Sequence, residues 1–116
     1  MAKLGYRHNT IGSTLYLIIT NEANQHMKGL DALFYNYDVD DWEDYVLYLT
    51  ETDDYLYEYT LPTLADGHYT SEVFEESDSL PYPTDSKLGV LSFDLKDGEF
   101  QTATDIVGDL SDLGSW

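Results

Sequence analysis

The chain of 116 residues contains no cysteine, which excludes disulfides, thiolate metal sites and a cysteine nucleophile. Basic residues are also scarce, because five lysines and arginines stand against 23 acidic residues and the formal net charge is −18. We therefore expect no binding to nucleic acid or to an anionic membrane surface. No stretch of the sequence approaches the roughly 20 apolar residues of a membrane span. The charge balance favours basic protein partners or divalent cations instead.

Apolar residues make up 42% of the chain, and aromatic residues 15% with eleven tyrosines. This content argues against the disorder that a high net charge alone would suggest. A chain of this length buries one hydrophobic core. Tyrosine packs its ring and keeps a polar tip wet, so it suits half-buried strands and interfaces.

Short β-rich runs alternate with turn signals along the chain, which is typical of a sandwich or small barrel. We predict an all-β domain: a single antiparallel β-sandwich, immunoglobulin-like or prealbumin-like, of about seven strands over residues 10–103. Residues 1–9 and 104–116 are expected to be flexible arms. A helical turn over residues 41–45 is a less favoured alternative to strand. The expected strands are 13–21, 32–39, 45–50, 55–61, 68–74 and 88–95, with 99–102 pairing to the last.

Tyrosines at alternate positions mark the run from Tyr55 to Leu61. Such a stripe most often packs one sheet face on the core, so we favour a buried position for Tyr55, Tyr57 and Tyr59. An exposed binding platform is the alternative. Farther along, Tyr69 should lie near a corner between sheets, where a sandwich tyrosine often ties its hydroxyl to nearby backbone.

The segment YVLYLTETDDYLYEYTLPTLADGHYTSEVFEESDSLPYPTDSKLGVLSFD carries a recurring pattern. A tyrosine-containing strand ends at Pro62. Gly67 and Tyr69 then begin a strand that ends in an acidic turn. A Pro-x-x-x-Asp segment precedes a last strand near Phe93. Over residues 13–95 the chain resembles small β-sandwich proteins encoded among the structural genes of tailed bacteriophages. The acidity and the tail depart from that group.

This resemblance implies a location in the virion, made in the host cytoplasm, as a capsid decoration (cement) protein or a neck or tail accessory. The implied partners are other virion proteins, either the major capsid protein or a connector or tail protein. The resemblance further implies a homo-oligomer or many copies, and no catalytic residues.

Sixteen acidic residues and no basic one lie in residues 31–86, so the ends of the chain are less charged. We therefore expect the partner contacts at the ends. Apolar residues of the tail have roughly helical spacing, which predicts either a docking arm or a frayed terminus. The expected contact residues are Leu4, Tyr6, Leu110, Leu113 and Trp116.

Two acidic turns are weak candidates for calcium: Asp38 and Asp40 in one, Asp53 and Asp54 in the other. Neither has the glycine and the terminal glutamate that an EF-hand loop requires, and we favour a solvated acidic rim with no metal or cofactor. No hydrolase, phosphate-binding or dinucleotide-binding motif is present, and we expect the protein not to be an enzyme.

An acidic mimic of DNA is the alternative function. Carboxylates that project along an extended face can occupy the groove of a host DNA-binding protein in place of phosphates. Here most acidic residues fall in predicted turns, so we rank mimicry below virion assembly.

Overall fold

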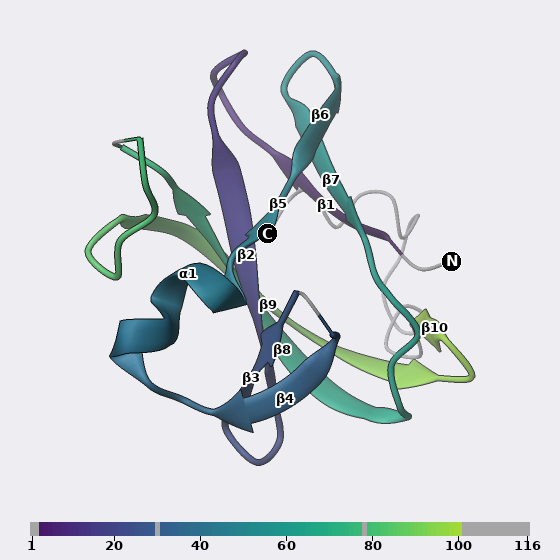
Figure 1. The fold of residues 1–116 in the computed structure, drawn as a ribbon. Helices are drawn as coiled ribbons and strands as arrows, with labels where there is room; N and C mark the ends of the chain where they lie inside the picture. Colours follow the sequence, from purple (N-terminus) through teal and green to yellow (C-terminus); the bar gives the residue numbers. More distant parts are fainter. Residues whose placement is uncertain (1–2, 30, 78, 101–116) are drawn as a thin grey trace.

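The computed structural model describes residues 3–29, 31–77 and 79–100, and it consists almost entirely of β-strands (Figure 1). Two antiparallel sheets pack together around a shared core, which confirms the predicted all-β sandwich. The strands are β1 (Lys3–Arg7), β2 (Leu15–Asn21), β3 (Gln25–Lys28), β4 (Leu33–Asn36), β5 (Leu47–Tyr48), β6 (Thr50–Asp53), β7 (Leu56–Thr60), β8 (Gly67–Glu75), β9 (Ser86–Lys96) and β10 (Glu99–Phe100). A 3₁₀ turn, η1 (Val39–Asp41), and one turn of helix, α1 (Trp42–Tyr45), interrupt them.

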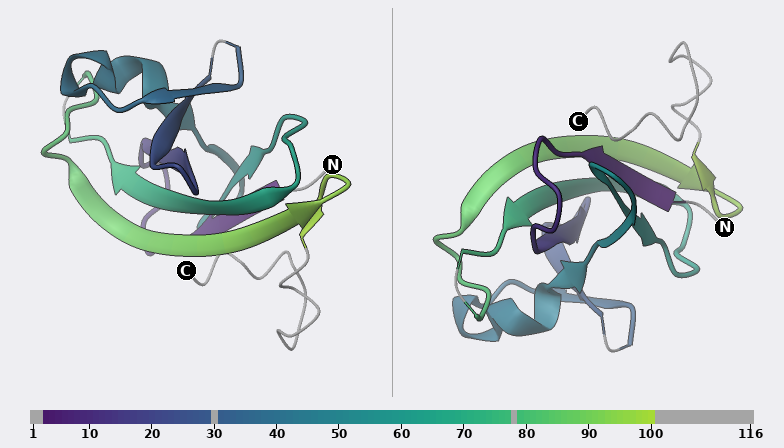
Figure 2. Two further views of the ribbon diagram at one scale, coloured as in Figure 1. Left: turned by 90° about the horizontal axis from the view of Figure 1, so that it is seen from below. Right: turned by 90° about the horizontal axis from the view of Figure 1, so that it is seen from above.

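The smaller sheet has the strand order β1-β7-β6, and the larger has the order β10-β9-β8-β2-β3-β4. The short β5 pairs with the amino-terminal half of β2 in the larger sheet, whereas β6 pairs with β7 in the smaller sheet. The chain therefore passes from one sheet to the other between β5 and β6. The longest pairing joins β8 and β9, with a register shift between Val73 and Phe74. Figure 2 shows how strongly these two strands curve.

Local turn chemistry explains the β9–β10 hairpin. Lys96 pairs with Glu99, which leaves Asp97 and Gly98 as a two-residue loop. Both loop residues have positive φ, 54° and 80°. A hairpin turn of this kind favours Asp-Gly, because its backbone twist matches that of the flanking strands. The expected pairing of the segment after Gly98 with the preceding strand is thus confirmed for β10.

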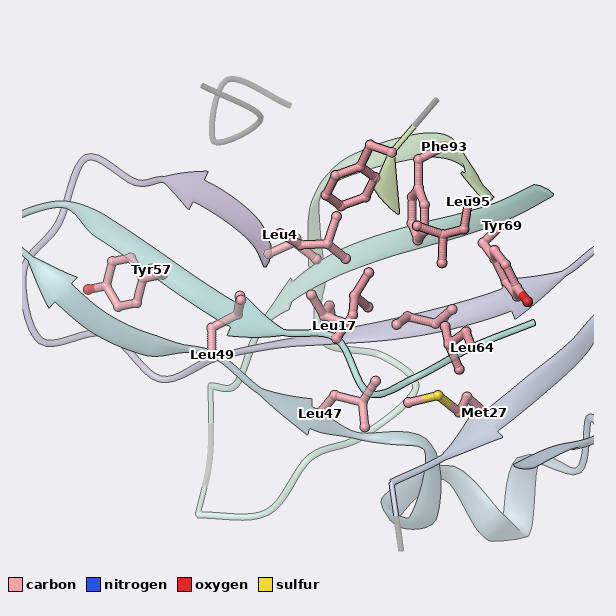
Figure 3. Packing of buried hydrophobic residues seen from close by; sticks show 14 of the residues in the cluster. Leu4, Leu17, Met27, Leu47, Leu49, Tyr57, Leu64, Tyr69, Phe93 and Leu95 are labelled. Atoms are coloured by element: carbon pink, nitrogen blue, oxygen red, sulfur yellow. The ribbon is translucent and has the colours of Figure 1, made fainter. Parts of the chain in front are cut away.

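The main core lies between the two sheets. Leu4 of the smaller sheet and Leu17 and Phe93 of the larger one are each almost fully buried, and Figure 3 shows their side chains directed into the same space. Burying one such side chain stabilises the fold by about 1.5–3 kcal/mol. A second cluster lies on the opposite face of the larger sheet, beneath α1, and consists of Tyr16, Ile18, Trp42, Tyr45 and Phe74.

The predicted amino-terminal arm is wrong for residues 3–7. These residues form β1, which pairs along its whole length with β7, from Lys3 opposite Thr60 to Arg7 opposite Leu56. Leu4 is fully buried in the core. The burial of Leu4 and the backbone hydrogen bonds to β7 together stabilise this short strand.

The predicted strand over residues 45–50 is also only partly right. Residues 42–45 form α1, as the helical-turn alternative predicted, and β5 and β6 follow it. Trp42 and Tyr45 both bury their rings against the larger sheet. These two aromatic side chains, three residues apart, lie on one face of a helical turn, which a strand would have placed on opposite faces.

The three tyrosines Tyr55, Tyr57 and Tyr59 do not all pack on the core. Tyr57 is buried and Tyr59 packs against the core, as predicted. Tyr55 lies instead in the β6–β7 turn with φ of 69° and 46% of its surface exposed, so its expected core position is wrong. The predicted corner is confirmed: the Tyr69 hydroxyl donates to the Ala65 carbonyl oxygen at 2.6 Å.

Candidate partner-binding edge

Strand β4 lies at one end of the larger sheet. It pairs with β3 from Leu33 opposite Lys28 to Asn36 opposite Gln25. Among the residues that the structure describes, no strand pairs with its other side. In Figure 2 the β3–β4 hairpin (blue) lies at the periphery, on the side of α1. A strand at the edge of a sheet offers backbone groups with which another chain can pair.

Apolar side chains project into solvent along this edge. Leu33, Tyr35, Tyr37 and Val39 are 58%, 36%, 47% and 51% exposed, and we call these four residues the β4 stripe. Phe34, between Leu33 and Tyr35, points the other way and packs against Tyr69, with tilted rings whose centroids are 5.6 Å apart. The strand predicted over residues 32–39 would place the four on one face, but in the structure β4 ends at Asn36 and Val39 begins η1. All four side chains are nevertheless exposed. Contiguous exposed apolar residues on an edge strand mark an interaction surface.

The carboxyl-terminal part of the β4 stripe is held in place by Tyr45 and His26. The Tyr45 hydroxyl accepts a hydrogen bond from the Asp38 amide at 2.9 Å and donates one to the Asn36 carbonyl oxygen at 3.3 Å. The Tyr37 ring packs against the His26 ring at 4.8 Å between centroids. The edge is therefore a fixed surface, and binding to it needs little ordering.

A hollow of about 440 Å³ opens beside the stripe, between the β3–β4 hairpin and α1, and its lining includes Asp31, Tyr35, Glu43 and Asp44. Lys28 also lines it and is the only cation that does so among the residues the structure describes. Its Nζ lies 3.4 Å from Asp41 and 3.7 Å from Asp44, and 4.6 Å from the centre of the Tyr35 ring.

Hydrogen bonds and neighbouring charges shift the pKa values of three residues that line this hollow, Asp31, Tyr35 and Lys28. The hydrogen bond from the Tyr35 hydroxyl, together with that from the Leu33 amide, lowers the pKa of Asp31. The same bond raises the pKa of Tyr35. For Lys28, desolvation lowers the pKa, but Asp41 and Asp44 outweigh it and raise the pKa above its ordinary value. Both shifts favour the charged forms, of Asp31 and of Lys28.

His26 lies beneath the stripe, between Tyr37 and Tyr45. Its Nδ1 is buried and has no hydrogen-bond partner. Burial lowers the pKa of His26, against the opposing effects of Glu72 and the Asn24 backbone. The ring therefore contributes to packing in its neutral form at pH 7.

The structure locates only part of the predicted contact set. Leu4 is fully buried in the core, so the prediction that it contacts a partner is wrong. Tyr6 packs partly against the same core, and burial raises its pKa. The other three predicted contact residues, Leu110, Leu113 and Trp116, and the tail 104–116 lie outside the described residues.

The two acidic turns do not come together. Asp38 caps η1 by accepting a hydrogen bond from the Asp40 amide at 3.0 Å. Asp53 accepts one from the Asp54 amide in the β6–β7 turn. In Figure 1 that turn lies at the top and α1 at the lower left, so no calcium ion could bridge the pairs. Within the described ranges, no group of three histidine or acidic side chains could hold a metal ion.

Several carboxylates accept hydrogen bonds from the backbone of neighbouring loops. Glu51 accepts from the Gly12 amide at 3.0 Å, and Glu22 from the His68 amide at 3.0 Å. Asp66 accepts from the Asp97 amide at 2.8 Å. Part of the acidity of the chain is therefore a structural device that ties loops together, a role the sequence pattern did not reveal.

His68 and Asp94 form the closest histidine–carboxylate pair in the described part of the chain, with Nδ1 2.6 Å from Oδ1. Such a pair can orient a general base. Here both side chains are nearly half exposed on the open face of β8 and β9. Thr70 and Ser92 form the next cross-strand contact at 3.3 Å. The arrangement is that of a polar ladder that stabilises strand pairing.

No protein-family model matches the chain, and no curated protein or solved structure is detectably similar to it. No helix in the described part of the chain is long and apolar enough to cross a membrane.

Proposed function

We propose that this protein is a structural assembly protein that binds another protein through the β4 edge. The observation that carries the proposal is the β4 stripe: four exposed apolar residues, two on β4 (Leu33 and Tyr35) and two in the segment that follows it (Tyr37 and Val39), at an edge whose other side has no strand neighbour among the described residues. An extended segment of a partner can add to such an edge, with backbone hydrogen bonds giving affinity and alternate side chains giving specificity.

We further propose that the partner is a virion protein, either the major capsid protein or a connector or tail protein, and that the chain acts in many copies. The resemblance of residues 13–95 to β-sandwich proteins of tailed bacteriophages supports this role. The absence of cysteine is compatible with assembly in a reducing cytoplasm.

Mass spectrometry of purified phage particles, with copy number per particle, tests the proposal. We expect the chain in the particles and expect Leu33→Ser/Val39→Ser to be lost from them without a large fall in melting temperature. Val90→Ser is the matched control, because Val90 is equally exposed, at 50%, but lies on β9. Absence of the wild-type chain, or normal incorporation of the double variant, would contradict the proposal.

A DNA mimic remains the alternative proposal. It would be absent from particles and would bind a host DNA-binding protein with steep salt dependence. The use of Glu22, Glu51 and Asp66 as acceptors for loop amides supports assembly over mimicry, because those carboxylates serve the fold.

A further inference from the structure

Resting on the proposed function, we propose that the segment which adds to β4 is extended and basic, and that one of its arginine or lysine side chains enters the hollow beside α1. The hollow adjoins the edge directly, because Tyr35 belongs to both the β4 stripe and the hollow lining. A strand laid along β4 projects every second side chain toward the same face as Leu33 and Tyr35.

Charge complementarity identifies this occupant. Three carboxylates line the hollow, those of Asp31, Glu43 and Asp44, against the single cation of Lys28. Lys28 is itself engaged by Asp41 and Asp44. Residues 31–86, which supply the three carboxylates, contain no lysine or arginine. An incoming guanidinium can pair with a carboxylate through two parallel hydrogen bonds.

The Tyr35 ring provides the second feature that suits a cation. Lys28 Nζ lies over the ring, 4.6 Å from its centre, so the ring already contacts one cation in this structure. A cation within about 6 Å of an aromatic centre is attracted by the ring. The apolar part of an arginine or lysine side chain would pack on the stripe while its charged end reaches the hollow.

The same charges disfavour a second copy of this chain at the edge. Self-pairing through β4 would bring Asp31, Asp38 and Asp40 of both copies to one interface, and each copy has a formal charge of −18. Like charges brought together in an interface suppress that pairing. A basic segment of a different protein meets no such repulsion.

Binding of synthetic peptides to the full chain tests the inference. One peptide of about eight residues, an ordinary strand length, alternates valine and threonine with arginine, and its partner carries glutamine at the arginine positions. By fluorescence anisotropy we expect the arginine peptide to bind at least about tenfold more tightly, with the difference shrinking as salt is raised. NMR shifts should concentrate on residues 33–39.

Three variants locate the effect. Glu43→Gln/Asp44→Asn should weaken arginine-peptide binding at least about threefold, because surface ion pairs are lost. Lys28→Met should strengthen it, because a competing cation leaves the hollow. Asp53→Asn/Asp54→Asn is the matched control, since it removes two charges from the distant β6–β7 turn and should leave affinity unchanged.

An equal effect of both double variants would show that only net charge matters and would overturn the inference. Equal binding of the two peptides would do the same. If Leu33→Ser/Val39→Ser is lost from particles while the two peptides bind with equal affinity, the proposed function is supported and the inference of a basic partner segment is wrong. Arginine-specific binding at β4 by a chain absent from particles would instead overturn the virion role.

Discussion

The hydroxyl of Tyr16 donates a hydrogen bond to Asp85 Oδ2 at 2.7 Å, across 69 residues of sequence, in a buried site. The Trp42 indole donates to the same hydroxyl at 3.2 Å, and the Tyr82 amide donates to the same carboxylate at 3.0 Å. This pair joins β2, α1 and the loop before β9. Since Glu43 and Asp44 of α1 line the hollow, this hydrogen-bonded pair helps to hold one wall of the proposed binding surface in position.

Removing the Asp85 carboxylate should destabilise the fold. Asp85→Ala leaves the Tyr82 amide without its acceptor and the Tyr16 hydroxyl with only the Tyr82 carbonyl oxygen at 3.3 Å, and a buried unsatisfied group costs about 1–3 kcal/mol. Urea denaturation measures the loss, and Asp85→Asn, which keeps one oxygen acceptor, should lose less. Asp40→Ala, on the exposed η1, should change stability by no more than about 0.5 kcal/mol. Equal stability of Asp85→Ala and wild type would refute the structural role of the pair.

The Tyr69 hydroxyl should be a measurable part of the corner between β7 and β8. Tyr69→Phe keeps the ring packed against Phe34 and Phe93 but removes the donor to the Ala65 carbonyl oxygen. We expect a loss of about 1 kcal/mol in the free energy of unfolding. Tyr55→Phe, in the exposed β6–β7 turn, is the control and should be neutral. A neutral Tyr69→Phe would mean that the corner is held by ring packing alone.

Stability should fall as the solution is made mildly acidic, partly through His26. Burial lowers its pKa below 6.5, so below that pH the unfolded chain binds more protons than the folded chain. The contribution of the neutral ring is therefore complete above pH 6.5 and is lost as pH falls through the folded-state pKa. His26→Gln should flatten this part of the stability curve. Identical slopes in His26→Gln and wild type would remove His26 as the cause.

At alkaline pH, Tyr48 is one of several tyrosines whose pKa is raised. Burial and then its hydrogen bond to Glu76 raise its pKa to about 12 from 10.0. The neutral phenol is thus favoured in the folded chain, and its contribution to stability, present below pH 10, is lost as pH rises toward 12. Ultraviolet titration of phenolate absorption should show one late-titrating tyrosine fewer in Tyr48→Phe than in wild type. The same late phase in both proteins would contradict the assignment.

Local signals were enough for several elements. The β-rich run before Asn21 predicted β2, the alternation around Tyr57 and around Tyr69 predicted β7 and β8, and the Asp97-Gly98 pair predicted the last hairpin. Each of these rests on residues adjacent in sequence. Adjacent residues determine the hydrophobic period, the turn type and the tendency to form a strand, whatever segments pack against them in the folded chain.

The sequence by itself therefore determined the β class, the absence of cysteine chemistry, and the shared face of Leu33, Tyr35 and Tyr37. Only the tertiary structure decided that this face points to solvent, because alternation sets which side chains share a face but not which face is covered. It likewise decided that Lys3–Arg7 and Gln25–Lys28 are strands. Each contributes one fully buried apolar residue, Leu4 or Met27, and pairs with strands that form elsewhere. The pairing of β1 with β7 joins segments far apart in the sequence, whereas β3 pairs with its sequence neighbours β2 and β4. Whether the outer side of β4 is covered depends on how the rest of the chain packs, so the binding edge could be located only in the folded protein.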